Sequence, residues 1–520
     1  MTGSSAHSWL IAALLLTYLG VGLLVFATRW LGAGARALAE ALHVAGLVAS
    51  LVLAVTIVVA ILDGQPVFLF DKWLMVDPLS AIFVGLVALV GTLTGWYSLG
   101  YLRGDLAHGK IEEKRVPVYY GFFHLFLFTM TLACVSNNLV MMWVSIELTT
   151  LSSVFLVGFY GQRSSLEAAW KYIIICTVGV AFGLYGTVLV FANANAVMGN
   201  AQNAILWSEA VLHADRFDHA TIAVAFVFVL IGFGTKAGLF PMHTWLPDAH
   251  SEAPSPVSGL LSAGLTSCVM LVIIRYTVIA LRAVGPHLPH MLFLVFGVLS
   301  IGVAALLMFV QRDLKRLLAY STVENMGIVA LGLGIGGPFG VSAALLHVMN
   351  HGLAKALMFC GAGNAQQRYG TRDLDAIKGM LRVAPVSGFF LLAGALALGG
   401  MPPFNVFVSE FMTVAAGIRA DDWGLMALCV VLLTIVLAAF ARMIGGSVLG
   451  PAPERERRRD LGWLSLAPLF VTLVLMLWMG VATPRPVRTL IANASAIVAQ
   501  ATPAGTLASD VATPDAKANP

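Results

Sequence analysis

The chain has 520 residues, of which 59% are hydrophobic and only 11% are charged, and its mean hydropathy is +0.89. Soluble domains carry about 25% charged residues, so the composition excludes an ordinary soluble protein and indicates a polytopic membrane protein. The formal net charge of +4 does not by itself indicate a type of partner, because the basic residues are concentrated in particular loops.

Apolar stretches recur along the chain at about the 20-residue length that an α-helix needs to cross the hydrocarbon core. We predict an all-α polytopic membrane protein with about 14 transmembrane helices. Their expected limits are 8–29, 40–62, 77–99, 118–136, 138–160, 167–192, 219–241, 255–281, 289–310, 314–336, 338–364, 383–418, 424–448 and 462–481. No Lys or Arg precedes the first stretch, which favours an uncleaved first span over a signal peptide.

Three segments depart from plain spans. Residues 63–76 are mixed in character and too short to cross, so we predict an interfacial hairpin or helix there. The stretch 383–418 is too long for one plain helix, and the run GGMPP at 399–403 divides it. The chain from Pro484 to Pro520 is rich in Ala, Thr and Pro, which predicts a loosely ordered tail.

Basic residues gather in every second loop, which sets the expected orientation. They are Arg103, Lys110, Lys114, Arg115, Arg312, Lys315, Arg316, Arg368, Arg372, Lys378, Arg382, Arg455, Arg457, Arg458 and Arg459. By the positive-inside rule these loops are cytoplasmic, so 14 spans put both termini in the periplasm of a bacterial inner membrane. We interpret the arginines at 455–459 as an inside anchor and expect no nucleic-acid partner.

The most informative residue is Lys236, which lies inside the apolar stretch from Ile222 to Phe240. A lysine at bilayer depth costs about 2.5–3.5 kcal/mol on insertion scales, so an intramembrane lysine is a functional candidate by default. Three glycines loosen this stretch and Pro241 ends it, which predicts a broken helix. A buried charge beside a helix break suggests an ion or proton path.

The two predicted broken helices correspond within a possible duplication. A shift of about 175 residues brings Lys236 beside Glu410 and Glu147 near Glu324, and broken helices in corresponding positions are typical of inverted repeats. We therefore predict two inverted five-helix repeats with helices 7 and 12 broken. The expected division is 1–117 for helices 1–3, 118–281 for the first repeat, 289–448 for the second, 462–481 for helix 14 and 482–520 for the tail.

Other ionisable residues fall inside predicted spans. His347, His351 and Lys355 recur every four residues, which places them along one helix face and suggests a proton relay. Glu147 could be the switchable partner of Lys236 or a neutral acid hydrogen-bonded to a neighbouring helix, and Glu324 is a further candidate for the relay. Glu410 follows the second break and could be an exit gate or a helix cap.

No cofactor or metal is expected in this chain. The five cysteines are far apart and form no C-x-x-C pair, and no nucleotide or haem motif is present. The histidine pair at 347 and 351 lacks a nearby carboxylate or cysteine that would favour metal binding. Lys171, Arg275 and His124 lie near span ends or beside weaker patterns, where snorkelling or hydrogen bonding accounts for them.

Two runs of sequence resemble a known family. GTKAGLFPMHTWLPDAHSEAP at 234–254 and QRDLKRLLAYS at 311–321 resemble the antiporter-like membrane subunits of respiratory complex I, cation/proton antiporters and energy-converting hydrogenases. The sequence around Glu147, Glu324 and Glu410 is most similar to the hydrogenase-4 component F branch of this family. The resemblance implies a 14-span core with two inverted repeats.

In that family a span-5 glutamate pairs with a span-7 lysine, and a charged residue in span 12 gates the outer side. The matching positions are Glu147, Lys236 and Glu410. The complex I subunits that the chain resembles most often carry a second lysine in span 8, and the matching position in this chain is Ser267. The implied partners are protons, lipid, other membrane-arm subunits and a peripheral redox module.

The sequence therefore predicts a proton-translocating membrane-arm subunit of a redox-driven complex of the hydrogenase-4 or NADH-quinone oxidoreductase type. The chain would be a subunit of an oxidoreductase without a redox centre of its own. Two alternatives stay open: a secondary Na⁺/H⁺ antiporter subunit and a structural scaffold that does not pump.

Overall fold

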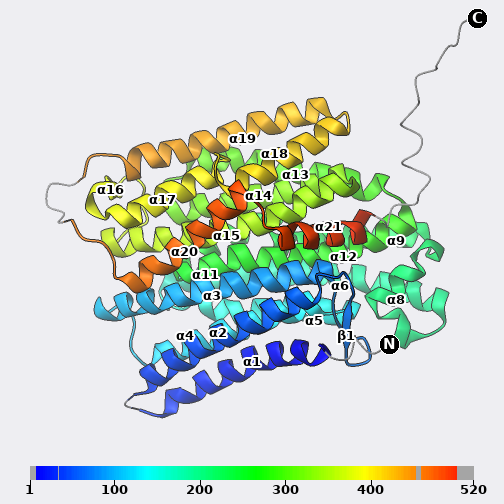
Figure 1. Cartoon of the computed structure of the whole chain (residues 1–520), viewed down its shortest axis with the longest axis horizontal. Coiled ribbons are helices and arrows are strands. Elements are labelled where there is room, and N and C mark those ends of the chain that lie inside the picture. The colour runs from blue at the N-terminus through cyan, green and yellow to red at the C-terminus, as the bar shows by residue number, and fades with distance from the viewer. Residues whose placement is uncertain (1–6, 33, 453–457, 500–520) are drawn as a thin grey trace, which may run out of the picture.

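The computed structural model describes residues 7–32, 34–452 and 458–499, and in these ranges long helices run side by side along the molecule (Figure 1). Twelve helices within the described ranges are long and apolar enough to cross a membrane. The all-α polytopic fold is therefore confirmed, whereas the count of 14 spans and the inverted repeats stay predictions.

The N-terminal part packs two peripheral helices against a buried one. Its elements are α1 (Ser8–Ala27), the 3₁₀ turn η1 (Thr28–Trp30), α2 (Ala35–Ala60), β1 (Val67–Leu69), β2 (Leu74–Val76) and α3 (Pro78–Ala107). The strands β1 and β2 pair antiparallel, so the hairpin was the correct alternative for residues 63–76. Asp77 caps α3 by accepting a hydrogen bond from the backbone N–H of Ser80 at 2.8 Å.

The middle of the chain contains the first broken helix. Its elements are α4 (Arg115–Val135), α5 (Leu139–Val157), α6 (Arg163–Met198), α7 (Ala201–Ala204), α8 (Trp207–Leu212), η2 (Ala214–Arg216), α9 (His219–Ala237), η3 (Met242–Thr244), α10 (Trp245–Glu252), α11 (Ser255–Leu260), the π turn η4 (Leu261–Leu265) and α12 (Thr266–Val284). Asn138 and Asp218 cap α5 and α9 through their side-chain oxygens. The predicted break in helix 7 is confirmed, because α9 stops at Ala237 and α10 resumes at Trp245.

The last part contains the second broken helix. Its elements are α13 (His287–Val310), α14 (Leu314–Ile335), α15 (Gly337–Tyr369), α16 (Met380–Val383), α17 (Pro385–Leu398), α18 (Asn405–Arg419), α19 (Trp423–Met443), the π turn η5 (Ile444–Val448), α20 (Trp463–Val481) and α21 (Arg485–Ala499). The predicted break in helix 12 lies between α17 and α18.

The expectation of a loosely ordered tail is wrong for residues 485–499, which form α21. Leu490, Ile491, Ala494 and Val498 recur at helical spacing and are buried, so packing overrides the local Ala, Thr and Pro bias. Residues 500–520 lie outside the described part of the chain.

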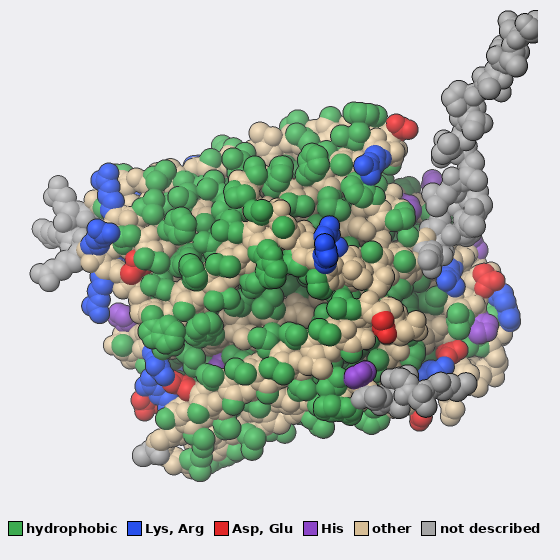
Figure 2. Space-filling view, viewed as in Figure 1, with side chains coloured by type: hydrophobic (Ala, Val, Ile, Leu, Met, Phe, Trp, Pro, Cys, Tyr) green, Lys and Arg blue, Asp and Glu red, His purple; other side chains and the backbone are tan. Residues whose placement is uncertain are grey.

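The core lies around the helices that carry the polar residues. The most apolar window of the α11–α12 segment is 100% buried and that of α14 is 89% buried, against 28% for α19. Peripheral helices such as α6 and α19 expose apolar side chains, and the face of the molecule seen in Figure 2 is largely apolar between its two ends. Lys and Arg side chains gather at the end of the molecule where α16 lies (Figures 1 and 2).

A buried ion pair joins the start of α3 to α12. Both terminal nitrogens of Arg275 donate to Asp77 at 2.6 Å, and one of them also donates to Oγ of Ser80 at 2.7 Å. The guanidinium lies 4.2 Å from the ring centroid of Trp207 on α8. Hydrogen bonding, and not snorkelling, is therefore the role of Arg275, whose side chain is only 2% exposed.

We predict that Arg275→Met lowers the free energy of unfolding by about 3–5 kcal/mol, because it leaves the Asp77 carboxylate buried and unpaired. The double variant Asp77→Leu/Arg275→Met should recover most of that loss. Thermal unfolding of the purified protein in detergent measures both. Lys72→Gln is the control, because Lys72 pairs with Glu209 at the surface and is 53% exposed. Equal unfolding temperatures for Arg275→Met and Lys72→Gln would contradict a structural role for the buried pair.

Candidate functional site

Lys236 occupies the last turn of α9, directly before the break. Gly238 ends α9 in the left-handed conformation at φ 85°, and the Lys236 side chain is completely buried. The carbonyl end of a helix carries a partial negative charge, which favours a cation there. The break therefore creates a position where a buried ammonium is less costly than inside an unbroken helix.

Neutral oxygens hold the ammonium group. Nζ of Lys236 donates to Oγ1 of Thr150 at 2.5 Å and to the hydroxyl of Tyr172 at 2.9 Å, and it lies 4.7 Å from the Tyr172 ring centroid. The Tyr172 hydroxyl is in turn hydrogen-bonded to Oγ of Ser153 at 2.7 Å. Helices α5, α6 and α9 together therefore form one cluster around Lys236.

Glu147 belongs to this cluster without touching the lysine. It lies three residues before Thr150 on α5, and its Oε1 accepts a hydrogen bond from Thr177 at 2.8 Å. The other carboxylate oxygen is buried and has no hydrogen-bond partner in the described part of the chain. Lys236 and Glu147 interact electrostatically, but their charged atoms are more than 4.0 Å apart and form no ion pair. The resemblance implied a direct Glu147–Lys236 ion pair, whereas in the structure Lys236 is hydrogen-bonded to Thr150 and Tyr172.

The three titratable residues of α15 are all buried, and each reaches a different neighbour. His347 is hydrogen-bonded to Oδ1 of Asn325 at 3.1 Å and to Oγ of Ser409 at 2.9 Å. His351 reaches the carbonyl of Ser262 at 3.2 Å. Lys355 donates to Oγ of Ser321 at 2.5 Å and to the carbonyl of Leu318 at 2.8 Å. The predicted common helix face is present, but no hydrogen bond joins the three directly.

The contact with His351 depends on the π turn η4. A π turn replaces the regular α-helical hydrogen bonds and leaves carbonyl groups free for other partners. Ser262 lies in this turn, and besides its carbonyl it offers a hydroxyl that is hydrogen-bonded to Oγ1 of Thr322 at 2.6 Å. The turn thus connects α15 to α14.

Glu324 lies between Lys355 and the second break. Its Oε2 accepts a hydrogen bond from the side chain of Asn325, and Asn325 also donates to the carbonyl of Ser321 at 2.6 Å. The other Glu324 oxygen is buried and has no partner in the described residues. Lys355 and Glu410 are both close enough to interact electrostatically with Glu324.

Glu410 faces the second break. It is the sixth residue of α18, beyond the first turn, so a capping role is excluded. Its side chain packs on Gly400, whose φ is +68° and whose missing Cβ would lie 2.2 Å from Oε2 of Glu410. The glutamate is 9% exposed, whereas Glu324, His347, His351 and Lys355 are fully buried.

The site residues form two hydrogen-bonded clusters. The Lys236 cluster contains Thr150, Ser153, Tyr172 and Lys236, with the Glu147–Thr177 pair beside it. The Lys355 cluster contains Ser321, Glu324, Asn325, His347, Asn350, Lys355, Asn405 and Ser409, and it ends beside Glu410. No hydrogen bond joins the two clusters within the described ranges. Ser267 does not bridge them, because its hydroxyl donates to Ala263 in its own helix at 2.7 Å.

Two buried residues near the Lys355 cluster were missed as site candidates. Lys315 was counted as a loop residue, which is wrong: it belongs to α14, is 1% exposed and donates to the carbonyl of Ala253. His250 on α10 is fully buried, and neither ring nitrogen has a partner among the described residues. Its ring is stacked on that of Phe359 with the centroids 5.1 Å apart, and it interacts electrostatically with Lys315 and Lys355. Both lie inside the two runs that carry the family resemblance, which was the available signal.

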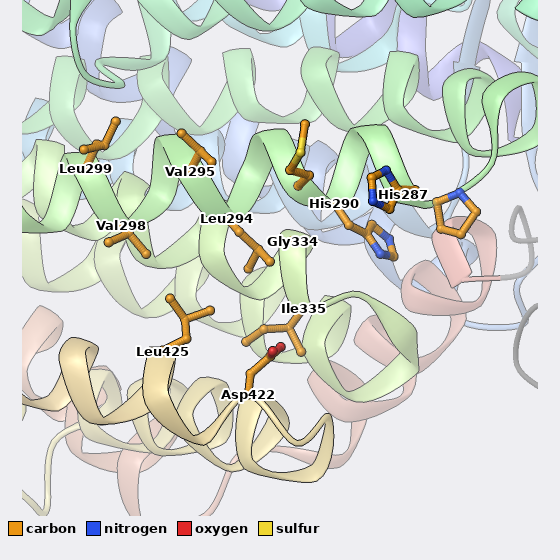
Figure 3. Close-up of a pocket in the computed structure, with 12 residues that line it drawn as sticks. His287, His290, Leu294, Val295, Val298, Leu299, Gly334, Ile335, Asp422 and Leu425 are labelled. Atoms are coloured by element: carbon orange, nitrogen blue, oxygen red, sulfur yellow. The ribbon is translucent and has the colours of Figure 1, made fainter. Parts of the chain in front are cut away.

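A wide pocket elsewhere does not belong to either cluster. It measures about 850 Å³ and opens on the outer faces of α13 and α19. Leu294, Val298 and Leu425 line it, His287 and His290 lie at one end, and Asp422 lies near Ile335 (Figure 3). Because its lining is almost wholly apolar, this pocket is no part of the polar line through the core.

Comparisons with known proteins identify the family. Residues 136–436 match the family described as NADH:quinone oxidoreductase/Mrp antiporter, transmembrane part. Residues 69–109 match the N-terminal part of NADH-ubiquinone oxidoreductase (complex I) chain 5. The chain therefore belongs to the complex I and Mrp antiporter family of membrane subunits, as the sequence resemblance implied.

Individual relatives agree with that assignment. The chain is 36% identical to the hydrogenase-4 component F homolog of Methylacidiphilum infernorum over 428 residues, which is 81% of this chain and 89% of the relative. It is 31% identical to NADH-quinone oxidoreductase subunit N of Desulforudis audaxviator, covering 74% and 75% of the two chains. The fold matches a chain of the Mrp complex from Dietzia sp. with a TM-score of 0.81 at 22% identity, over 96% of this chain and 100% of that one.

The contact between Glu410 and Gly400 gives a prediction about the second break. Gly400→Ala forces a side chain into the left-handed region and against the carboxylate, and should cost about 1–3 kcal/mol of stability. Gly424→Ala is the matched control, because a Cβ there meets open space and alanine is the better helix former. Thermal unfolding in detergent compares the two. If both variants unfold at the same temperature as the parent protein, the glycine is not required at the break.

Proposed function

We propose that this chain is a proton-translocating membrane-arm subunit of a redox-driven complex. The observation that carries the proposal is the Lys355 cluster, in which buried hydrogen bonds connect Lys355 by way of Ser321, Asn325 and His347 to Ser409, next to Glu410. Ionisable residues at this depth are costly and mark ion or proton routes in membrane proteins. The assembly would be of the hydrogenase-4 or NADH-quinone oxidoreductase type, and this chain would contribute no redox centre.

In this proposal Lys236 is the first proton carrier. Thr150 and Tyr172 are neutral, so they hold the ammonium without fixing its charge. A carboxylate close to Lys236 favours the protonated form, and moving or protonating Glu147 favours release. Glu147 is poised for that role because one of its oxygens is buried without a partner. A rotation of the Glu147 or the Lys236 side chain would break its present hydrogen bond to a threonine and would allow Lys236 and Glu147 to form an ion pair.

The Lys355 cluster would then carry the proton towards Glu410. His347 Nε2 faces the amide oxygen of Asn325 and therefore carries the ring hydrogen, which leaves Nδ1, facing the Ser409 hydroxyl, as the nitrogen that can take up a proton. Because an amide oxygen neither supplies nor carries a proton, transfer past Asn325 would need a bridging water. Glu324 lies beside both Lys355 and Asn325 and can stabilise a charge at either end of the cluster. Glu410, which is buried and packs against Gly400 at the break, is the proposed outer gate.

Transfer between the two clusters is the step that would need a driving force. No side-chain hydrogen bond spans the gap in the described structure, so crossing it requires bridging water or a movement of His351, His250 or a neighbouring helix. Redox chemistry in partner subunits would supply that movement. The cytoplasmic half-channel would reach Lys236, and both chain termini would face the periplasm.

We predict that Lys236→Ala and Glu410→Gln each reduce proton movement by the reconstituted complex at least about tenfold, since each removes a group whose charge must change during transfer. Acidification of proteoliposomes, followed with a pH-sensitive dye, measures the effect. Lys72→Gln at the surface is the control and should leave the rate unchanged. Wild-type rates in assembled Lys236→Ala complexes would refute the proposal and favour the scaffold.

The same proteoliposomes distinguish a proton pump from a Na⁺/H⁺ antiporter subunit. With sodium replaced by choline, a proton pump should keep its rate, whereas a Na⁺/H⁺ antiporter subunit should lose activity and should take up labelled sodium. Sodium uptake that disappears in Lys236→Ala would identify the antiporter alternative.

A further inference from the structure

We propose that a pocket at the basic end of the molecule binds the phosphate headgroup of an anionic phospholipid, such as phosphatidylglycerol or cardiolipin. The pocket, here called the basic pocket, has a volume of about 470 Å³. Its polar lining includes Gln311, Arg312, Asp375, Lys378, Arg442 and Ser447. It lies between the end of α13, the segment before α16 and the turn η5.

The cations of this pocket have no acidic partner among the residues that the structure describes. Arg312, Lys378 and Arg442 form no ion pair within 4.0 Å with any described acidic residue, although Asp375 also lines the pocket. The Arg442 guanidinium donates to the backbone carbonyl of Gln311 and lies 5.7 Å from the ring centroid of Phe309. Three cations against one carboxylate leave a net positive cavity, and guanidinium and ammonium groups are the usual ligands of phosphate oxygens.

Other basic residues at the same end of the molecule do have acidic partners. Arg316 pairs with Asp248 at 2.7 Å, Arg372 with Glu252 at 3.0 Å, and Lys114 with Glu112 at 2.6 Å. An ordinary inside anchor would account for scattered basic residues. It does not account for three cations that surround one cavity and lack an acidic partner within residues 7–32, 34–452 and 458–499, so a bound anion is the better explanation.

The position of the pocket selects a lipid as the source of that anion. It begins where α13 ends, and the last two turns of α13 expose Leu306 at 62% and Val310 at 62% on the apolar outer face. Basic pockets beside transmembrane helices at the cytoplasmic surface suit anionic headgroups, because the acyl chains can continue along the helix. A phosphate held by the three cations would place its acyl chains against α13.

The turn η5 provides the space for the headgroup. Gly445 and Gly446 line the pocket, and a Cβ added at Gly445 would meet nothing within 4 Å. A Cβ at Gly446 would lie 3.8 Å from Nζ of Lys378, so the ammonium points along this glycine surface. A large side chain at position 445 can therefore fill the cavity without a clash in the protein itself.

Lipid retention tests the charges. Native mass spectrometry of the purified complex, titrated with phosphatidylglycerol, should show one anionic lipid bound with higher affinity than the rest. Arg312→Gln and Lys378→Gln should each weaken it about fivefold, since one basic side chain near the surface contributes about 1 kcal/mol. Lys114→Gln is the charge-matched control and should retain the lipid. Equal retention by all three variants would overturn the proposal.

Filling the cavity tests the space independently of charge. Gly445→Leu should remove the tightly held lipid, whereas Gly424→Leu, at the other end of α19 and also facing open space, should not. Unchanged retention in Gly445→Leu would overturn the assignment to this pocket. Proton movement is not the readout, so failure of the lipid site and failure of the proposed function are distinguishable.

The same titration separates the possible sources of the phosphate. Phosphatidylglycerol should raise the unfolding temperature of the parent protein and not that of Arg312→Gln/Lys378→Gln. Inorganic phosphate and phosphatidylcholine should have little effect on either protein. Stabilisation by inorganic phosphate equal to that by phosphatidylglycerol would show a site for soluble anions and overturn the choice of a lipid.

Discussion

The cost of keeping an ionisable side chain away from water is the constraint on which the rest of the structure depends. An isolated charge in the membrane interior is unfavourable, so each such group requires a partner, a helix end or a neutral state. Lys236 uses the carbonyl end of α9 and two hydroxyl groups, and Arg275 uses a paired carboxylate. The broken helices and the π turn η4 are the places where backbone groups become free to meet these needs.

The two kinds of buried charge differ in what they can do. Asp77 and Arg275 neutralise each other through two short hydrogen bonds, so their charges are fixed and their role is structural. Lys236, Lys355 and the histidines of α15 are held mainly by hydroxyl, amide and carbonyl groups, which accept either protonation state at lower cost. A neutral environment around a titratable group is what a proton carrier requires, and a matched ion pair is what an anchor requires.

The sequence predicted the features that depend on local chemistry. Gly238 and Pro241 predicted the first break, and Gly399, Gly400 and the two prolines that follow predicted the second. Glycine and proline change the backbone conformation of their own segment, so their effect can be predicted locally. Contacts between helices were not predictable in this way. The hydroxyls of Thr150 and Tyr172 reach Lys236 from two other helices, and nothing in their own segments marks them. Lys315 was misplaced because a loop motif and a helix start look alike in sequence. The tail helix α21 was missed because its burial comes from other parts of the chain.

Infrared difference spectroscopy of the carboxyl groups during turnover tests the central idea most directly. If protons travel through the buried clusters, turnover of the assembled complex should shift the carbonyl stretching bands of protonated carboxyl groups. In deuterium oxide these bands should move, and the components from Glu324 and Glu410 should vanish in Glu324→Gln and Glu410→Gln. A spectrum without any carboxyl change during turnover, or one that neither variant alters, would contradict proton transfer through this site.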